Sequence, residues 1–201
     1  MALSKDELER LYYNEQLSMQ QIATHYRCSL NKIVYWMEKY GFERRSASEA
    51  TYLHKNPDGD PFLIKMPDTP EGWKLFGVGI GIYMGEGTKQ GGQLAVSNSN
   101  PGILQAFLLF LEKICGVSRS DIRADLNIFD DCDAEGAVSW WAHKLGLEVE
   151  QFYPPTTREG KKGSYKKKSR YGTLSIRYYN TKLLNIINSW CHEYFEELNN
   201  T

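Results

Sequence analysis

Glu86 is the carboxylate whose neighbours make it a candidate for chemistry. It stands between Gly85 and Gly87 at the end of an apolar, glycine-dense stretch, Leu75-Phe-Gly-Val-Gly-Ile-Gly-Ile-Tyr-Met-Gly-Glu-Gly87. Glycines let a backbone approach a phosphate closely, and carboxylate oxygens are ligands that Mg²⁺ prefers. We therefore favour a metal ion or a phosphate near Glu86 over the alternative, an ordinary helix-end carboxylate on the surface.

A basic segment is the second candidate. The formal net charge is −1, yet residues 156–182 hold nine Lys or Arg and one acidic residue. A local patch matters more than total charge for binding a polyanion. Residues 158–170 are predicted to bind a phosphate backbone, with a solvated loop as the alternative. The predicted contacts are Lys161, Lys162, Lys166, Lys167, Lys168 and Arg170.

Several other classes of function are excluded. A G-x-G-x-x-G nucleotide fingerprint would need glycine at position 82 or 84, where Ile82 and Met84 stand, so we expect no nucleotide cofactor. The acidic residues at 130, 131 and 133 lack the glycine and distal Glu of a calcium loop, and we expect a helix start there. The four cysteines form no C-x-x-C pair, the first residues lack the apolar region typical of a signal peptide, and no apolar run is long. We expect a cytoplasmic protein without a membrane span.

The glycine-rich stretch fits a strand by alternation and a helix by four-residue spacing. Thr69-Pro70 decides for a helix over 70–85, because Thr is a good N-cap and Pro suits the first helical position. Gly77, Gly81 and Gly85 then share one face. Each interior glycine costs about 1 kcal/mol relative to alanine. That cost predicts close contact of this face with another helix.

The rest of residues 69–201 predicts an α+β domain, with helices packed on one face of a mixed or antiparallel sheet. The predicted strands are 93–97, 121–129, 148–153 and 171–179, with residues 156–170 as a loop. The predicted helices follow Asn100, Asp130 and Asn180.

Residues 1–46 predict a small all-α domain. Ser18 and Gln21 form a capping box, Ser29 caps the next helix, and Gly41 stops it. Four prolines between residues 57 and 70 mark residues 47–68 as a linker, in which 62–64 is a short strand or an anchor.

The pattern Leu17-Ser-Met-Gln-Gln-Ile-Ala23, Cys28-Ser29 and Ile33-Val34 resembles resolvase-like and sigma-factor-like helix-turn-helix domains. Arg27 stands where those families usually have glycine. The resemblance implies a recognition helix in the major groove. The implied DNA contacts are Ser29, Asn31, Lys32, Tyr35, Lys39, Arg44 and Arg45. A helical bundle that binds protein is the alternative.

Gly79-Ile-Gly-Ile-Tyr-Met-Gly-Glu-Gly87 resembles the motif of LAGLIDADG homing endonucleases. The downstream order agrees: Ser97-Asn-Ser-Asn-Pro101, a strand ending in Asp130-Asp131, and Tyr171-Gly-Thr-Leu-Ser-Ile-Arg177 before a final helix. The resemblance covers about residues 70–195.

This resemblance implies a homodimer that packs the Gly77, Gly81 and Gly85 faces of two helices together, with a saddle-shaped sheet across double-stranded DNA. It implies that Glu86, with Gly85, holds Mg²⁺ or another divalent cation at the scissile phosphate. Basic side chains assist the hydrolysis in that family. Lys162, Lys166, Lys167 and Lys168 are candidates, of which we name Lys166 and Lys168. Arg177 and Tyr179 would lie on the sheet, where they either read bases or pair across strands, and we name Arg177 as a DNA contact.

Two other functions stay open. One is a DNA-binding regulator with an inactive nuclease-like core, since family members commonly carry Asp where Glu86 stands. The other is RNA-splicing maturase activity through the same surface.

Overall fold

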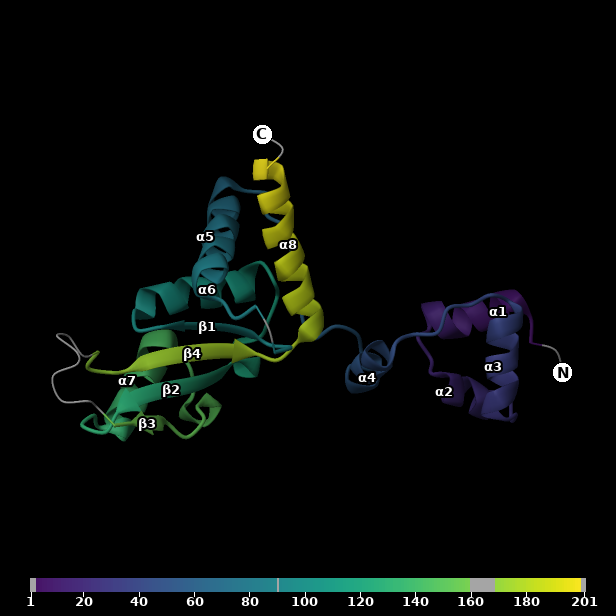
Figure 1. Cartoon of the computed structure of the whole chain (residues 1–201), viewed down its shortest axis with the longest axis horizontal. Helices are drawn as coiled ribbons and strands as arrows, with labels where there is room; N and C mark the ends of the chain where they lie inside the picture. The colour runs from purple at the N-terminus through teal and green to yellow at the C-terminus, as the bar shows by residue number, and fades with distance from the viewer. Residues whose placement is uncertain (1–2, 90, 160–168, 200–201) are drawn as a thin grey trace. The chain divides into compact units, whose positions relative to one another are not determined.

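The computed structural model of the chain describes residues 3–89, 91–159 and 169–199. They belong to two compact units, residues 1–61 and residues 62–201, named here the N-terminal unit and the C-terminal unit (Figure 1).

The N-terminal unit is entirely helical in its regular structure. It contains α1 (Lys5–Glu9), which continues as a π-helical turn (Arg10–Asn14), then α2 (Met19–His25), α3 (Leu30–Lys39) and α4 (Ala47–Lys55). The predicted capping box is confirmed, because Ser18 Oγ accepts from the Gln21 amide and Gln21 Oε1 accepts from the Ser18 amide. Arg27 adopts a φ of 48° in the turn between α2 and α3. This is the left-handed conformation in which glycine would be unstrained.

The predicted linker 47–68 contains a helix, α4, that was not predicted. Ser46 and Glu49 form a second capping box that starts this helix. None of the α4 residues is buried. Local hydrogen bonds therefore define this helix rather than packing, and the prolines that we used to infer a linker begin only after it ends.

Residues 62–65 attach to the C-terminal unit, which favours the predicted anchor over a strand. Phe62 is buried in its core. The Leu63 amide donates to the Cys115 carbonyl at 3.1 Å, and the Lys65 amide donates to the Ile114 carbonyl at 2.8 Å.

The C-terminal unit is a mixed α+β structure. Its helices are α5 (Pro70–Glu86), α6 (Pro101–Lys113), α7 (Ala134–Leu145) and α8 (Thr181–Asn199). Its strands are β1 (Leu94–Asn98), β2 (Arg123–Phe129), β3 (Thr156–Arg158) and β4 (Thr173–Tyr178). Short 3₁₀ turns span Arg119–Asp121 and Val149–Gln151. The sheet order is β1-β4-β2-β3, with β4 antiparallel to both neighbours and β3 parallel to β2.

One predicted strand is wrong. Residues 148–153 begin with the 3₁₀ turn, where the buried side chain of Gln151 donates from Nε2 to the carbonyls of Arg119 and Ile122 at 2.7 and 2.9 Å. Only Phe152 forms a bridge to β2. The pairing strand comes later, as β3, inside the predicted loop 156–170. Its side chains are all exposed, so it lacks the apolar alternation by which a strand is recognised.

Helices α5, α6, α7 and α8 form the core with one face of the sheet. In β2 every second residue is buried, and Ala124, Leu126 and Ile128 face the helices. Figure 1 shows α7 behind β4 and β2, and α5 beside α8 above α6. The remaining strand residues point to the other side of the sheet.

Candidate nucleic-acid interface

The side of the sheet turned away from the helices carries mostly polar side chains. We call it the open sheet face and define it by Ser97, Arg123, Asp125, Asn127, Thr173, Ser175 and Arg177. The register places Ser97, Ser175 and Asp125 in one row across three strands. Ala95, Arg177 and Arg123 form a neighbouring row. Apolar and polar residues alternate along the strands, so the polar side chains of neighbouring strands lie together on one surface.

Arg177 is held near the middle of this face. Its Nη2 donates to Asp125 Oδ2 at 2.6 Å, and both side chains are about three-quarters buried. Its Nε is buried and has no hydrogen-bond partner among the described residues. Leaving a buried donor without a partner costs free energy. The Arg177 Nε–H would recover that free energy by donating to an acceptor that reaches the sheet.

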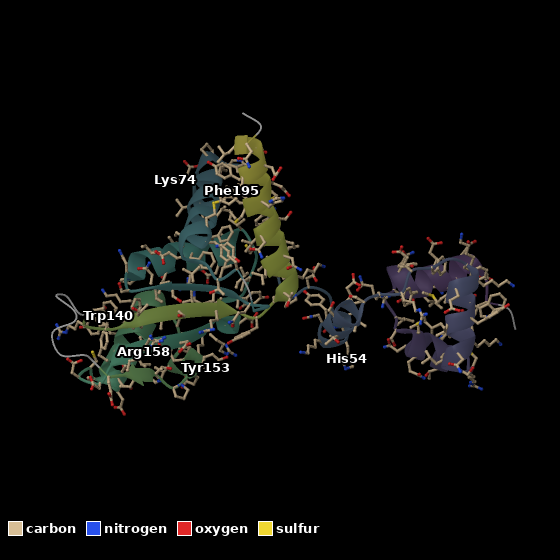
Figure 2. All side chains as sticks on the ribbon, in the orientation of Figure 1. His54, Lys74, Trp140, Tyr153, Arg158 and Phe195 are labelled. Atoms are coloured by element: carbon tan, nitrogen blue, oxygen red, sulfur yellow. The ribbon has the colours of Figure 1, made fainter. Side chains whose placement is uncertain are left out.

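Two tyrosines lie at one end of the face. Tyr153 follows the 3₁₀ turn and Tyr179 follows β4, and their hydroxyl oxygens are 3.3 Å apart. The hydrogen bond to Tyr153, together with burial, raises the pKa of Tyr179. Both rings are exposed, and Figure 2 labels Tyr153. These hydroxyls add neutral donors to the surface.

The glycines of α5 divide into two groups. A Cβ built on Gly79 would lie 2.6 Å or less from three atoms of Phe110 in α6, so Gly79 is required by packing within the chain. Around Gly77, Gly81 and Gly85 a Cβ would meet nothing within 4 Å. We call these three the open glycine face. No contact among the described residues offsets the helix stability that these three glycines cost relative to alanine.

Glu86 is the last residue of α5 and is exposed. The chain then joins the sheet, since Gly87 bridges to Val96 and the Thr88 amide donates to the Ala95 carbonyl at 2.9 Å. The carboxylate therefore lies where the helix meets the β1 edge. Among the described residues, no three His, Cys, Asp or Glu side chains are close enough together to hold a metal ion.

The turn that carries Glu86 is wrapped around Tyr83, which is completely buried. The Tyr83 hydroxyl lies 2.9 Å from the Thr88 carbonyl oxygen and 3.0 Å from Asn188 Oδ1 on α8. Burial raises the pKa of Tyr83 to about 12, so the phenol keeps its proton. Burial lowers the pKa of Lys89, whose Nζ contacts the Tyr83 ring and carbonyl.

In the N-terminal unit, α3 presents the predicted recognition residues to solvent. Ser29, Asn31, Tyr35 and Lys39 are exposed, and Lys32 is half-buried. Ser29 occupies the N-cap position of α3, but its side chain makes no capping hydrogen bond. The hydroxyl is therefore not committed to the helix.

Arg44 and Arg45 differ although they are adjacent. Arg44 pairs with Glu38 at 3.1 Å on the surface. The Arg45 guanidinium lies over the Tyr12 ring and donates to the backbone carbonyls of Tyr12, Gln16 and Leu17. Because its donors are engaged within the unit, we leave Arg45 out of the proposed DNA contacts.

The basic segment is only partly described. Lys161, Lys162, Lys166, Lys167 and Lys168, including both residues named as catalytic, lie outside the described residues. Arg170 is exposed, 5.4 Å from the centre of the Tyr171 ring.

Tyr171 stacks in parallel on Trp140 of α7, with ring centres 4.0 Å apart, beside a pocket of about 540 Å³. Figure 2 labels Trp140 near the end of the sheet. This pair was not predicted, because two residues 31 positions apart, one in a helix and one in a loop, give no shared signal in the sequence.

Sequence analysis also missed Asp125, Ser97 and Ser175. The signal was present, since these are the polar positions of strands whose apolar positions we used to predict the core. The Ser97 and Ser175 hydroxyls are 2.5 Å apart, and that cross-strand partner depends on register.

No family model, curated protein or solved structure matches the chain. Within the described residues, none of the helices combines the length and the apolar character that crossing a bilayer requires.

Proposed function

We propose that this protein binds double-stranded DNA through the open sheet face, as a LAGLIDADG-type homodimer that hydrolyses phosphodiester bonds with a divalent metal ion. The observation that carries the proposal is a sheet covered by helices on one side and lined by polar side chains on the other. A sheet within a globular domain ordinarily buries its apolar face and can leave a polar one free. Arg177 and Arg123, with Asp125 paired to Arg177, give this free face a formal net charge of +1.

The open glycine face supports the homodimer. Helices whose small residues form one stripe can bring their backbones close together. Exposed Val78, on the same side of α5, adds apolar area to that surface. A two-fold axis beside α5 would pair the stripe with its own copy and bring both Glu86 carboxylates to one place.

Glu86 fits a divalent cation by its chemistry. It supplies a carboxylate, and the carbonyl end of α5 carries the negative end of the helix dipole. The backbone carbonyl of Gly85 is a further oxygen ligand at that end. When bound, Mg²⁺ would lower the pKa of a coordinated water and stabilise charge on the phosphate. Glu86 would hold the ion, and the open sheet face would hold the DNA.

The DNA-binding proposal is tested by Arg177→Ala in a fluorescence-anisotropy titration with a mixed-sequence duplex. Loss of one arginine contact typically costs about 1–3 kcal/mol, so we expect affinity to fall about tenfold or more. Lys113→Ala is the matched control, because Lys113 is an exposed cation at the end of α6, which packs on the helix-covered side of the sheet. Equal effects of the two variants would contradict binding at the open sheet face.

The N-terminal unit would extend the DNA contact through α3. Lys39 lies 4.6 Å from the centre of the Trp36 ring, which orients its ammonium group on the helix surface. Lys32→Ala and Tyr35→Ala should change sequence preference in a binding selection. An unchanged preference would restrict the N-terminal unit to another role.

A DNA-binding regulator without nuclease activity is the second candidate. The observation that favours it is that the described residues of the protomer bring no three His, Cys, Asp or Glu side chains together, at Glu86 or elsewhere. Binding of duplex DNA without cutting, under conditions in which the protein is dimeric and Mg²⁺ is present, would support this candidate.

A further inference from the structure

Gly87, which follows the candidate metal-binding carboxylate, is required by its neighbour Tyr83. Its φ of −81° and ψ of 144° suit any residue. A Cβ at Gly87 would nevertheless lie 2.6 Å or less from two carbon atoms of the Tyr83 ring and from its carbonyl oxygen. Space, and not backbone conformation, selects glycine here. The chain after Glu86 therefore follows the surface of the Tyr83 ring.

The Tyr83 carbonyl fixes the start of this turn. It accepts a hydrogen bond from the Gly87 amide at 2.9 Å and another from Lys89 Nζ. The Lys89 ammonium also lies 3.8 Å from the centre of the Tyr83 ring. On the core side, the same ring stacks on Phe107, with ring centres 6.3 Å apart and planes 11° apart. Tyr83 is thus held between the core and the turn.

The Tyr83 hydroxyl fixes the end of the turn. It lies within hydrogen-bond distance of the Thr88 carbonyl and of the Asn188 side chain. A phenol has one hydrogen and also accepts. If it donates to Thr88, turning the Asn188 amide over would let its NH₂ group donate to the phenol oxygen. Both contacts are then satisfied, and α8 becomes part of the support for the turn.

We propose that Tyr83, Asn188 and Lys89 are positioning residues that hold the backbone on both sides of Glu86, and so fix where its carboxylate meets metal and DNA. The role of the carboxylate rests on the proposed function, whereas the fixing of the turn does not. None of the three residues is placed against the reacting phosphate. A carboxylate on a turn with a fixed backbone meets its ligand with little loss of conformational freedom, and mobility in such a turn lowers the rate of reaction.

Tyr83→Phe is the test, because it removes only the hydroxyl and keeps the ring. The first measurement is amide hydrogen exchange by NMR on the full-length protein. We expect the Gly87 and Thr88 amides to exchange at least tenfold faster, while amides of β2 and β4 are unchanged. Tyr194→Phe is the matched control, since Tyr194 is an exposed tyrosine on α8 and should change neither.

The second measurement is single-turnover cleavage of bound duplex DNA in Mg²⁺. We expect Tyr83→Phe to reduce the rate about tenfold with an unchanged Kd for DNA. We expect Asn188→Ala to do the same, and the double variant to be no slower than the slower single variant, because both act through one turn. Rates equal to wild type, or multiplied effects in the double variant, would overturn the shared role.

The exchange result separates this inference from the proposed function. If the wild-type protein does not cut DNA, the nuclease assignment fails, and faster exchange at Gly87 and Thr88 still establishes the positioning network. Unchanged exchange at these amides would overturn the network whatever the nuclease does. A uniform increase across the C-terminal unit would also overturn it, because that pattern reports general destabilisation.

Discussion

Alanine at Gly79 and alanine at Gly81 should have opposite effects on the stability of the C-terminal unit, although the two positions are separated by one residue in α5. Both substitutions raise helix propensity by about 1 kcal/mol. They differ in what the new methyl group meets. At Gly79 it meets the buried Phe110 ring, and at Gly81 it meets nothing within 4 Å.

The magnitude follows from the packing. Ordinary Cβ contacts begin near 3.4 Å, so Phe110 would have to move by roughly an ångström in a close-packed core. Overpacking of this kind costs about 1–3 kcal/mol. After the gain in helix propensity, we expect Gly79→Ala to lower the free energy of unfolding by up to about 2 kcal/mol. We expect Gly81→Ala to raise it by about 0.5–1 kcal/mol.

Urea unfolding followed by tryptophan fluorescence provides the assay, because Trp73, Trp140, Trp141 and Trp190 belong to the C-terminal unit. The measurement is made at a protein concentration where the wild type sediments as a monomer. Sedimentation at higher concentration then tests the open glycine face, where Gly81→Ala should weaken self-association despite its more stable fold. A Gly79→Ala protein as stable as Gly81→Ala would refute the distinction between a packed and an open glycine face.

Two further predictions concern side chains whose environment is unusual. Burial raises the pKa of Cys115 from 9.0 to about 12, so its contribution to stability is complete below pH 9 and is lost as pH rises toward 12. By pH 10.5 the loss in the free energy of unfolding is about 2 kcal/mol. The urea midpoint should therefore fall between pH 7.5 and pH 10.5, and it should fall less for Cys115→Ala than for the wild type or the control Cys132→Ala. Arg45→Ala should destabilise the N-terminal unit by about 1–3 kcal/mol because three backbone carbonyls lose a donor. Arg44→Ala, which removes a surface ion pair, should cost under about 1 kcal/mol. Urea unfolding followed by the fluorescence of Trp36, the tryptophan within residues 1–61, measures both variants.

The helices of this protein could be predicted because their ends carry local signals. Thr69-Pro70 starts α5, Asn100-Pro101 starts α6, and Ser18 with Gln21 starts α2, each through hydrogen bonds within three residues. Helix α4 has the same signal in Ser46 and Glu49, and the prolines after it led us to pass over it. Strand β3 could not be predicted, because its partner β2 lies 29 residues earlier in the register and its own side chains are exposed.

The candidate site likewise has a part that the sequence predicts and a part that it does not. Glu86 and the open glycine face follow from spacing along one helix. The Asp125–Arg177 pair joins residues 52 positions apart, and the Tyr83–Asn188 contact joins residues 105 positions apart. Such contacts depend on strand order and helix packing, which spacing along the chain does not encode. The engagement of Arg45 with backbone carbonyls also needed the tertiary structure.

The most direct test of the proposed function is a cleavage selection from a randomised duplex library in Mg²⁺, with the wild-type protein and Glu86→Gln in parallel. Gln keeps the size of the side chain and removes its charge. We predict that the wild type enriches a defined site and cuts both strands, and that Glu86→Gln binds the same site with similar affinity without cutting it. Cutting by Glu86→Gln at the wild-type rate, or no cutting by a dimeric wild-type protein that binds the library, would contradict the assignment of Glu86 as the metal-binding carboxylate of a nuclease.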